Sequence, residues 1–175
     1  MTTISCRYDG GLRCAAEHEP SGSLISTDAP VDNAGKGERF SPTDLIATSL
    51  ATCLLTVMGI VAERHGWSLE GASARVQKTM SSEPPRRIAA LEVWLTLPAS
   101  LEERQRRVLR RAAEGCPVKA SLEGAIAMTM HWECSALHRA GPALAHGIGG
   151  GRCSSGGGHA EEDGGLQQQQ GDPQG

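Results

Sequence analysis

A long apolar segment at residues 40–66 is bounded by polar residues, and no residue from Leu45 to Ala62 is charged. Ser41 stands at the position of an N-cap, and Asp44 follows three residues later, as in a capping box. Gly66 suits the left-handed residue that ends many helices. Because a helix that is apolar on all sides must be buried all round, this pattern predicts a long central helix covered by the rest of the domain.

Segments of alternating apolar and polar residues flank the central helix on both sides. Such alternation is typical of half-buried strands, and Gly, Pro and Asp at the boundaries favour turns. A capping-box pattern at Ser100–Glu103 predicts a second helix with an arginine-rich outer face. The order of elements predicts an α+β fold with antiparallel sheets around the central helix. The expected strands are Thr3–Tyr8, Leu12–Glu19, Ser23–Ser26, Ala72–Met80, Leu91–Leu97 and Ile126–Glu133, and the other expected helices are Leu101–Ala113 and Val118–Leu122.

The composition of the chain changes at about Ser135. The segment that follows holds Gly-rich runs and consecutive glutamines but no periodic apolar pattern, so it cannot bury a core. We therefore expect one domain at residues 1–134 and a disordered Gly/Gln-rich tail at residues 135–175.

Charge and hydropathy narrow the classes of partner. The formal net charge of −3 gives no overall basic field for nucleic acid, and the arginines of the second helix are better interpreted as a solvated face. A membrane span is an alternative for Leu45–Ala62, but its Ser and Thr residues and the capped ends favour a core helix. No Sec-type signal is visible at residues 1–10, so we expect a cytoplasmic protein that binds neither nucleic acid nor membrane.

Six cysteines are spread along the chain without a C-x-x-C pair or a zinc-ligand spacing, so no metal site is expected. In a reducing cytosol they would be free thiols. Cys53 falls near the middle of the central helix, where an inert core thiol is the simplest interpretation. Cys116 precedes Pro117 at the start of a short predicted helix, and the free N–H groups and helix dipole there predict a lowered thiol pKa.

Two motifs, F-S-P-T-D-L-I-A-T-S-L-A-T-C and C-P-V-K-A-S-L, resemble those of the OsmC/Ohr family, the osmotically inducible and organic hydroperoxide resistance proteins. The resemblance extends over about Thr3–Glu133. It implies an α+β fold in which two chains form an intertwined homodimer, with the long helix of each at the dimer centre. Enzymes of the family are thiol peroxidases of the stress defence, and they use no metal, flavin or other cofactor.

The resemblance also implies roles for individual residues. By motif, Cys53 is the peroxidatic cysteine, which reduces an organic hydroperoxide to an alcohol, and Cys116 is the resolving cysteine, which then forms a disulfide with it. A dithiol reductant, typically a lipoylated protein, restores both thiols. The family site uses an N-terminal arginine, for which Arg13 is the candidate and Arg39 the alternative. Because burial raises the pKa of a thiol, Cys53 needs such a cation nearby.

One position departs from the family pattern. In the enzymes a glutamate lies ten positions before the peroxidatic cysteine and orients the arginine. This chain has Thr43 at that position. Asp44 and Glu38 are candidate substitutes. Ten helical residues span about 15 Å, so a group at position 43 cannot easily reach Cys53 of its own chain. We therefore expect a partner chain to bring such a group to Cys53.

Two hypotheses concern what the protein binds: an organic peroxide as substrate, or a ligand of a non-catalytic protein. Leu50, Leu54 and Val57 lie near Cys53 on the helix and are expected to form apolar walls that favour organic peroxides over hydrogen peroxide. The missing glutamate favours the second hypothesis, a non-catalytic dimeric stress protein or small apolar-ligand-binding protein of the same family.

Overall fold

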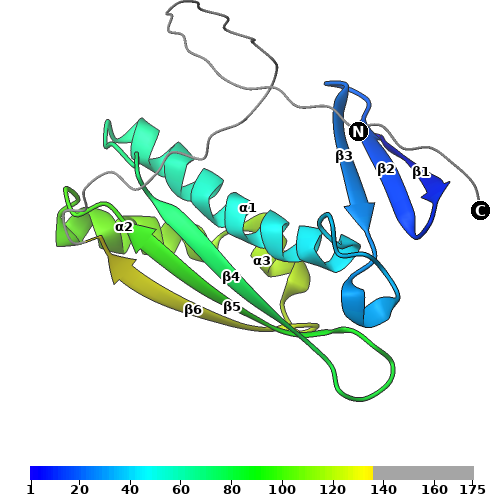
Figure 1. Ribbon diagram of the computed structural model, residues 1–175. Helices are drawn as coiled ribbons and strands as arrows, with labels where there is room; N and C mark the ends of the chain where they lie inside the picture. The colour runs from blue at the N-terminus through cyan, green and yellow to red at the C-terminus, as the bar shows by residue number, and fades with distance from the viewer. Residues whose placement is uncertain (136–175) are drawn as a thin grey trace, which may run out of the picture. The chain divides into compact units, whose positions relative to one another are not determined.

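The computed structural model describes residues 1–135 (Figure 1). The predicted tail falls almost entirely on residues 136–175, outside the described residues, so the domain boundary stays a prediction. The described chain has the predicted α+β composition. Its elements are β1 (Ile4–Gly10), β2 (Arg13–His18), β3 (Ser23–Asp28), a 3-10 turn (Val31–Asn33), α1 (Pro42–Arg64), β4 (Ser73–Met80), β5 (Ile88–Leu97), α2 (Glu103–Glu114), α3 (Pro117–Leu122) and β6 (Ala127–Cys134).

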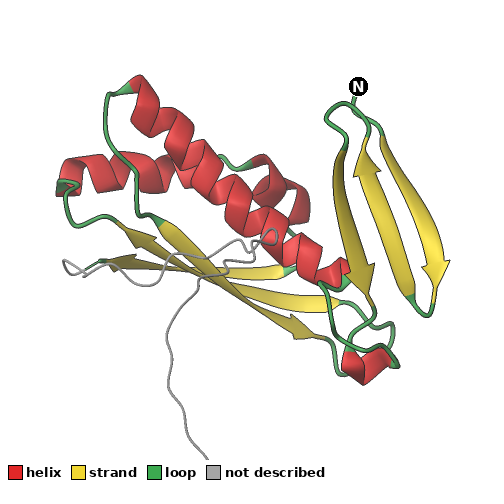
Figure 2. Cartoon of the chain, turned by 45° about the horizontal axis from the view of Figure 1, so that its top comes forward, coloured by secondary structure: helices red, strands yellow, loops and turns green. Residues whose placement is uncertain are grey.

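The strands form two separate three-stranded sheets. In the N-terminal sheet β1, β2 and β3 pair antiparallel in chain order. In the second sheet β4 and β5 are antiparallel, but β6 runs parallel to β5, so the expectation of purely antiparallel sheets is wrong for this strand. The reason is the connection, because α2 and α3 carry the chain back before β6 begins, as a parallel pair requires. Figure 2 shows the three helices on one face of the second sheet.

The predicted ends of the central helix are confirmed. The Asp44 N–H donates to Ser41 Oγ at 3.2 Å, and the Ser41 N–H donates to Asp44 Oδ2 at 2.8 Å, which completes the capping box. Lys78 of β4 reinforces it from outside, with Nζ at 2.6 Å from Asp44 Oδ1. Gly66 follows the helix with φ of +67°, the left-handed conformation that only glycine adopts without strain. The start of α2 differs from its prediction, since Glu102 is the N-cap and donates its N–H to Gln105 Oε1.

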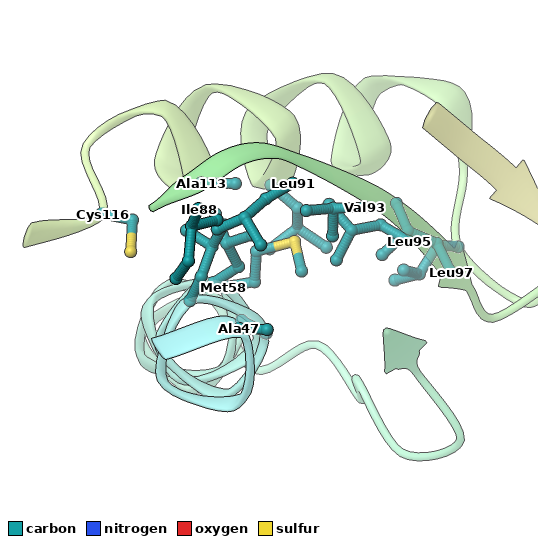
Figure 3. Packing of buried hydrophobic residues seen from close by; sticks show 14 residues of the cluster. Ala47, Met58, Ile88, Leu91, Val93, Leu95, Leu97, Ala113 and Cys116 are labelled. Atoms are coloured by element: carbon teal, nitrogen blue, oxygen red, sulfur yellow. The ribbon is translucent and has the colours of Figure 1, made fainter. Parts of the chain in front are cut away.

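One face of α1 forms the core together with β5 and α2 (Figure 3). The prediction that α1 is buried all round is wrong within residues 1–135, because the described elements cover only one of its sides. Among the residues of the opposite side, Ile60 is 44% exposed. By length and composition α1 is the helix of residues 1–135 that could cross a membrane, although core helices of globular proteins meet the same criteria. The buried residues of α1 are Ala47, Leu50, Leu54, Met58 and Ala62.

The N-terminal sheet has no comparable core. None of the buried apolar side chains of residues 1–135 comes from β1, β2 or β3. Instead Leu24 and Ile25 of β3 are 72% and 51% exposed, and Ile4 of β1 is 61% exposed. A loop joins this sheet to the start of α1. The ends of the loop are held together by the N–H of Asp28, the last residue of β3, which donates to the Phe40 carbonyl at 3.1 Å.

Candidate active site

The structure brings Cys53 and Cys116 together, although they lie on different elements. Cys53 is half-buried on α1 and packs against the core, whereas Cys116 is fully buried. Cys116 belongs to the core cluster against which Cys53 packs, and both are free thiols. Figure 3 shows Cys116 at one end of the core cluster with its sulfur on the side of α1.

Local sequence explains how Cys116 reaches this position. Gly115 caps the C-terminus of α2, and Pro117 occupies the first position of α3, where its missing N–H costs nothing. Cys116 between them is the N-cap of α3, as predicted, with an extended backbone at φ −63° and ψ 124°. The turn between the two helices therefore directs the thiol inward rather than to solvent.

The expected lowering of the Cys116 pKa is wrong. Burial raises the pKa of this thiol, and the neighbouring Cys53 raises it further. The backbone N–H groups of Lys119 and Val118 act in the opposite direction, as the helix position predicts, but they do not outweigh burial. Cys116 is therefore held as a neutral thiol beside Cys53.

Lys119 is a charged neighbour of Cys116 that sequence reasoning did not single out. Its side chain is 15% exposed, and its Nζ lies 3.0 Å from Glu114 Oε2 and 3.8 Å from Glu123 Oε1. The hydrogen bond to Glu114 is the main reason that the pKa of Lys119 is raised, and Cys116 contributes to the same shift. The signal was present in the C-P-V-K motif, where a lysine follows the cysteine by three positions.

Arg13 lies on β2 and is held by two carboxylates of its own chain. Its Nη2 forms an ion pair with Glu38 and lies 3.5 Å from Asp28 Oδ2. Within residues 1–135 no hydrogen bond or ion pair joins Arg13 to Cys53, so one chain alone does not assemble the expected cation and thiol. The alternative, Arg39, donates from Nη1 to Ser26 Oγ at 2.8 Å.

The structure distinguishes between the two candidate substitutes for the family glutamate. Asp44 is occupied by the capping box and by Lys78, whose Nζ also donates to Thr43 Oγ1 at 2.7 Å. Partial burial opposes the ionisation of Asp44, but these hydrogen bonds prevail and lower its pKa. Glu38, in contrast, binds Arg13 directly. Of the two, Glu38 therefore has the contact that orients an arginine.

Asp28 is a second residue that sequence reasoning missed. It is fully buried at the end of β3, directly opposite Arg13 in the sheet register. Its Oδ2 accepts the Glu38 N–H at 3.1 Å, and this bond is the largest of the contacts that lower the pKa of Asp28. Asp28 therefore holds both members of the Arg13–Glu38 pair, one by charge and the other by its backbone.

The surroundings of the thiols differ from the expected apolar pocket. Leu50 and Leu54 are only 1% and 0% exposed and pack in the core, so they cannot line a substrate site, whereas Val57 is half-buried. A hollow of ≈ 700 Å³ lies at the start of α1. Glu38 and Lys78 line this hollow, but neither thiol does. Residues 1–135 hold no group of three His, Cys, Asp or Glu side chains placed to bind a metal ion.

Comparison with known proteins agrees with this fold. The sequence model described as OsmC-like protein matches residues 35–131. A crystal structure from Psychrobacter arcticus 273-4, named for osmotic stress induction and a detoxification response, is 41% identical and covers 76% of this chain and 96% of that one, with a TM-score of 0.71.

More distant relatives share the fold. The organic hydroperoxide resistance protein OsmC of Legionella pneumophila is 21% identical and covers 76% of this chain and 96% of that one, with a TM-score of 0.60. An organic hydroperoxide resistance structure from Vibrio cholerae is also 21% identical, with 74% and 90% coverage and a TM-score of 0.58. A search of curated proteins found no match. The family model and the Psychrobacter relative together identify this chain as a member of the OsmC-like family.

Proposed function

We propose that the protein is a thiol peroxidase that reduces organic hydroperoxides to alcohols as part of stress defence. The observation that carries the proposal is that Cys53 of α1 packs against the core cluster to which Cys116, at the start of α3, belongs, and that both are free thiols. Membership in a family whose solved members include organic hydroperoxide resistance proteins supports the substrate class. A reducing cytoplasm would keep both thiols free before reaction.

The proposed cycle has three steps. In the first, the Cys53 thiolate attacks the terminal oxygen of the hydroperoxide, so an S–O bond forms, the O–O bond breaks and an alkoxide leaves. The product on Cys53 is a sulfenic acid, and the alkoxide takes up a proton to become the alcohol. In the second, Cys116 loses its proton and its sulfur attacks the sulfenic sulfur, so the S–S bond forms, the S–OH bond breaks, and the proton and hydroxide leave as water. In the third, a dithiol such as a lipoylated protein reduces the disulfide by exchange and is itself oxidised.

We further propose that the active unit is a homodimer. Two features support this: the uncovered side of α1 and the exposed apolar residues of the N-terminal sheet, both of which a second copy would bury. The same arrangement would provide the missing cation. Arg13, held by Glu38 and Asp28 in one protomer, would then face Cys53 of the other protomer and favour its thiolate.

The catalytic proposal is tested by peroxide consumption. Purified protein with dihydrolipoamide should consume cumene hydroperoxide through many turnovers, and Cys53→Ser should abolish this because a serine hydroxyl is almost un-ionised at neutral pH. Cys134→Ser, at the exposed end of β6, is the matched control and should retain activity. One equivalent of peroxide should yield a Cys53–Cys116 disulfide in peptide mass maps. If Cys53 and Cys116 oxidise no faster than Cys6 and Cys14, the peroxidase proposal is wrong.

The shared site is tested by mixing two inactive variants. Cys53→Ser retains Arg13, and Arg13→Ala retains Cys53, so a mixed dimer holds one complete site only if the two residues act across the interface. Unfolding and refolding the variants together should restore about a quarter of wild-type activity, since half of the dimers are mixed and each has one complete site. No recovery, with mixed dimers demonstrated by mass, would place Arg13 and Cys53 of the same chain in one site.

A non-catalytic binding protein is the second candidate. The observation that favours it is the hollow at the start of α1, which is lined by Phe40, Ala47 and Val76 but by neither thiol. If this hollow binds a small apolar ligand, Ala47→Trp should abolish binding of a fluorescent apolar probe. The cysteines should then stay reduced when cumene hydroperoxide is added.

A further inference from the structure

We infer that the outer face of α2 is a docking surface for an acidic protein that carries the dithiol reductant. This inference rests on the proposed peroxidase function, because it names the kind of partner that reduces the Cys53–Cys116 disulfide. The docking surface consists of Arg104, Arg107 and Arg111, and we call it the arginine face.

The arginine face is built by helical spacing. Its residues are three and four positions apart, so they lie within about 60° of one another, on the side of α2 opposite its buried residues. All three arginines are exposed, and together with Val108 they line a hollow of ≈ 440 Å³. Guanidinium groups around a hollow present forked N–H donors, and this geometry fits carboxylates.

The carboxylates of α2 are engaged elsewhere. Glu103 forms ion pairs with two other arginines of the helix, and Glu114 forms one with Lys119. Within residues 1–135 no hydrogen bond or ion pair involves a side chain of the arginine face. Like charges three and four positions apart weaken a helix, so the arrangement does not serve the stability of α2. A local cost without a structural gain is typical of a functional surface.

The surrounding charges favour an acidic protein over a nucleic acid. The three arginines span about 10 Å along the helix. Carboxylates lie at both ends of this span, Glu102 and Glu103 at the start and Glu114 at the end. A continuous phosphate backbone would run past the arginines and meet these carboxylates, in a chain whose net charge is −3. A compact acidic patch on a protein contacts the arginine face alone. The same face of a second copy is excluded as the occupant, because arginines would then face arginines.

The position of the arginine face points to the reductant. Arg111 lies one helical turn before Gly115. Gly115 and Pro117 are exposed on either side of the buried Cys116, so a protein bound to α2 lies next to the turn that contains this cysteine.

The reduction itself is an exchange of thiols and disulfides. One donor thiolate attacks a sulfur of the Cys53–Cys116 disulfide, forms a mixed disulfide and releases the other cysteine as a thiolate. The second donor thiolate then breaks the mixed disulfide and releases the first cysteine. Each released cysteine takes up the proton that a donor thiol has lost. Two electrons therefore pass to the protein, and the donor ends as a disulfide.

The experiment uses two synthetic dithiol peptides as probes. Both contain a dihydrolipoyl-lysine, which is flanked by glutamates in one peptide and by glutamines in the other. The protein is first oxidised with one equivalent of cumene hydroperoxide, and its reduction by each peptide is followed at low ionic strength. The glutamate peptide should react about tenfold faster than the glutamine peptide, at the lower end of the range for electrostatic attraction. High salt should remove this advantage.

Variants separate docking from chemistry. Replacement of Arg104, Arg107 and Arg111 together by Gln should abolish the advantage of the glutamate peptide. The rate with uncharged dihydrolipoamide should change by less than about twofold, because the charges that attract an anion have no part in its reaction. Arg107→Gln alone should remove part of the advantage. Arg87→Gln is its matched control, since Arg87 is exposed before β5 and its side chain forms no ion pair with another described residue.

Equal rates with the two peptides would overturn the inference. Equal losses in Arg107→Gln and Arg87→Gln would also overturn it, because net charge alone would then explain the attraction. If a single-stranded oligonucleotide displaces the glutamate peptide at lower concentration than the peptide itself requires, measured by fluorescence anisotropy, the arginine face is a nucleic-acid site instead.

Two further outcomes concern the fold and the proposed function. If the triple variant also reacts more slowly with dihydrolipoamide, its fold is disturbed, and the comparison of Arg107→Gln with Arg87→Gln decides. If cumene hydroperoxide produces no Cys53–Cys116 disulfide in wild type, the peroxidase proposal fails, and the inference fails with it. If the disulfide forms and dihydrolipoamide reduces it, but the glutamate peptide has no advantage, only the inference fails.

Discussion

The N-terminal sheet and the layer formed by α1, α2, α3 and the second sheet belong to the same chain, yet only the layer has a core. In the layer, Leu54, Met58, Leu91 and Leu95 are 0% exposed. In the N-terminal sheet, Leu24 is 72% exposed. A three-stranded sheet without a covered face is marginally stable by itself, so its apolar side chains need another surface.

The thiol pair and the arginine of the candidate site lie on opposite sides of the same division. Both thiols lie in the layer that has its own core, whereas Arg13 lies on the sheet that lacks one. A thiol pair needs a rigid, dry environment, and the core provides it. The cation depends on a sheet that a second copy would cover, so assembly and activation of Cys53 would be the same event. Substitutions in the layer should therefore reduce the stability of the fold, whereas substitutions in the N-terminal sheet should weaken the dimer or the activity.

The largest expected effect comes from the core of the layer. Leu54→Ala removes a side chain that is 0% exposed between α1 and its neighbours, and it should lower the free energy of unfolding by about 2–5 kcal/mol. Urea denaturation followed by circular dichroism measures this loss. Leu24→Ala, on the exposed sheet, is the matched control in protein kept monomeric by dilution, where its cost should be about 0.5 kcal/mol or less. A cost as large as that of Leu54→Ala would mean that the sheet has its own core.

Ile25 of β3 tests whether the sheet is covered in the assembly. Burying one isoleucine fully contributes about 1.5–3 kcal/mol; Ile25 is 51% exposed before assembly, but a homodimer loses two copies, so Ile25→Ala should weaken the dimer roughly 10- to 100-fold if a second copy covers it. Sedimentation over a range of protein concentrations measures the dissociation constant. An unchanged constant would remove β3 from the interface, and a stable folded monomer of the wild type at micromolar concentration would contradict the dimer.

Substitutions of Glu38 and Asp44 distinguish a residue that orients Arg13 from one that stabilises the fold. Glu38→Gln removes the charge that holds Arg13 and should lower kcat/KM about tenfold, which corresponds to about 1.4 kcal/mol. Asp44→Asn should instead reduce stability and leave the kinetics near wild type, because Asp44 contacts Ser41 and Lys78. Initial rates with cumene hydroperoxide and urea denaturation distinguish the two effects. If instead Asp44→Asn lowers kcat/KM and Glu38→Gln lowers only stability, Asp44 is the substitute for the family glutamate.

The order of elements, the caps of α1 and the position of Cys116 could be predicted from sequence, because periodicity and capping are local signals. Ser41, Asp44 and Gly66 behave as their neighbours in the chain require. The parallel pairing of β6 and the one-sided burial of α1 could not be predicted, because they depend on which elements meet in space. The same holds for Cys116, whose pKa is set by burial rather than by the helix end.

A smaller loss of stability is expected at the N-cap of α1, where the N-terminal sheet is joined to the layer. Ser41 is 2% exposed, and its Oγ caps the helix and lies 3.0 Å from Thr43 Oγ1. Ser41→Ala should cost about 1 kcal/mol, a common value for an N-cap that accepts a backbone hydrogen bond. Ser41→Asp, which can cap in the same way, is the control in urea denaturation and should recover part of the loss. Full stability in the alanine variant would show that Lys78 and Asp44 hold the helix start without the hydroxyl.

The smallest expected effect is a pH dependence of stability that originates at Cys116. Because the folded state raises the pKa of this thiol, it retains the proton at a pH where the unfolded chain has begun to lose it. The stabilisation is therefore complete below the unfolded pKa, near 8.5, and is lost as the pH rises toward the folded value. Cys116→Ser lacks this titration and keeps the other cysteines, so the difference in unfolding free energy between wild type and variant isolates it. Between pH 8 and pH 10 wild type should lose stability relative to the variant. A relative gain instead would mean that the N–H groups at the start of α3 prevail over burial.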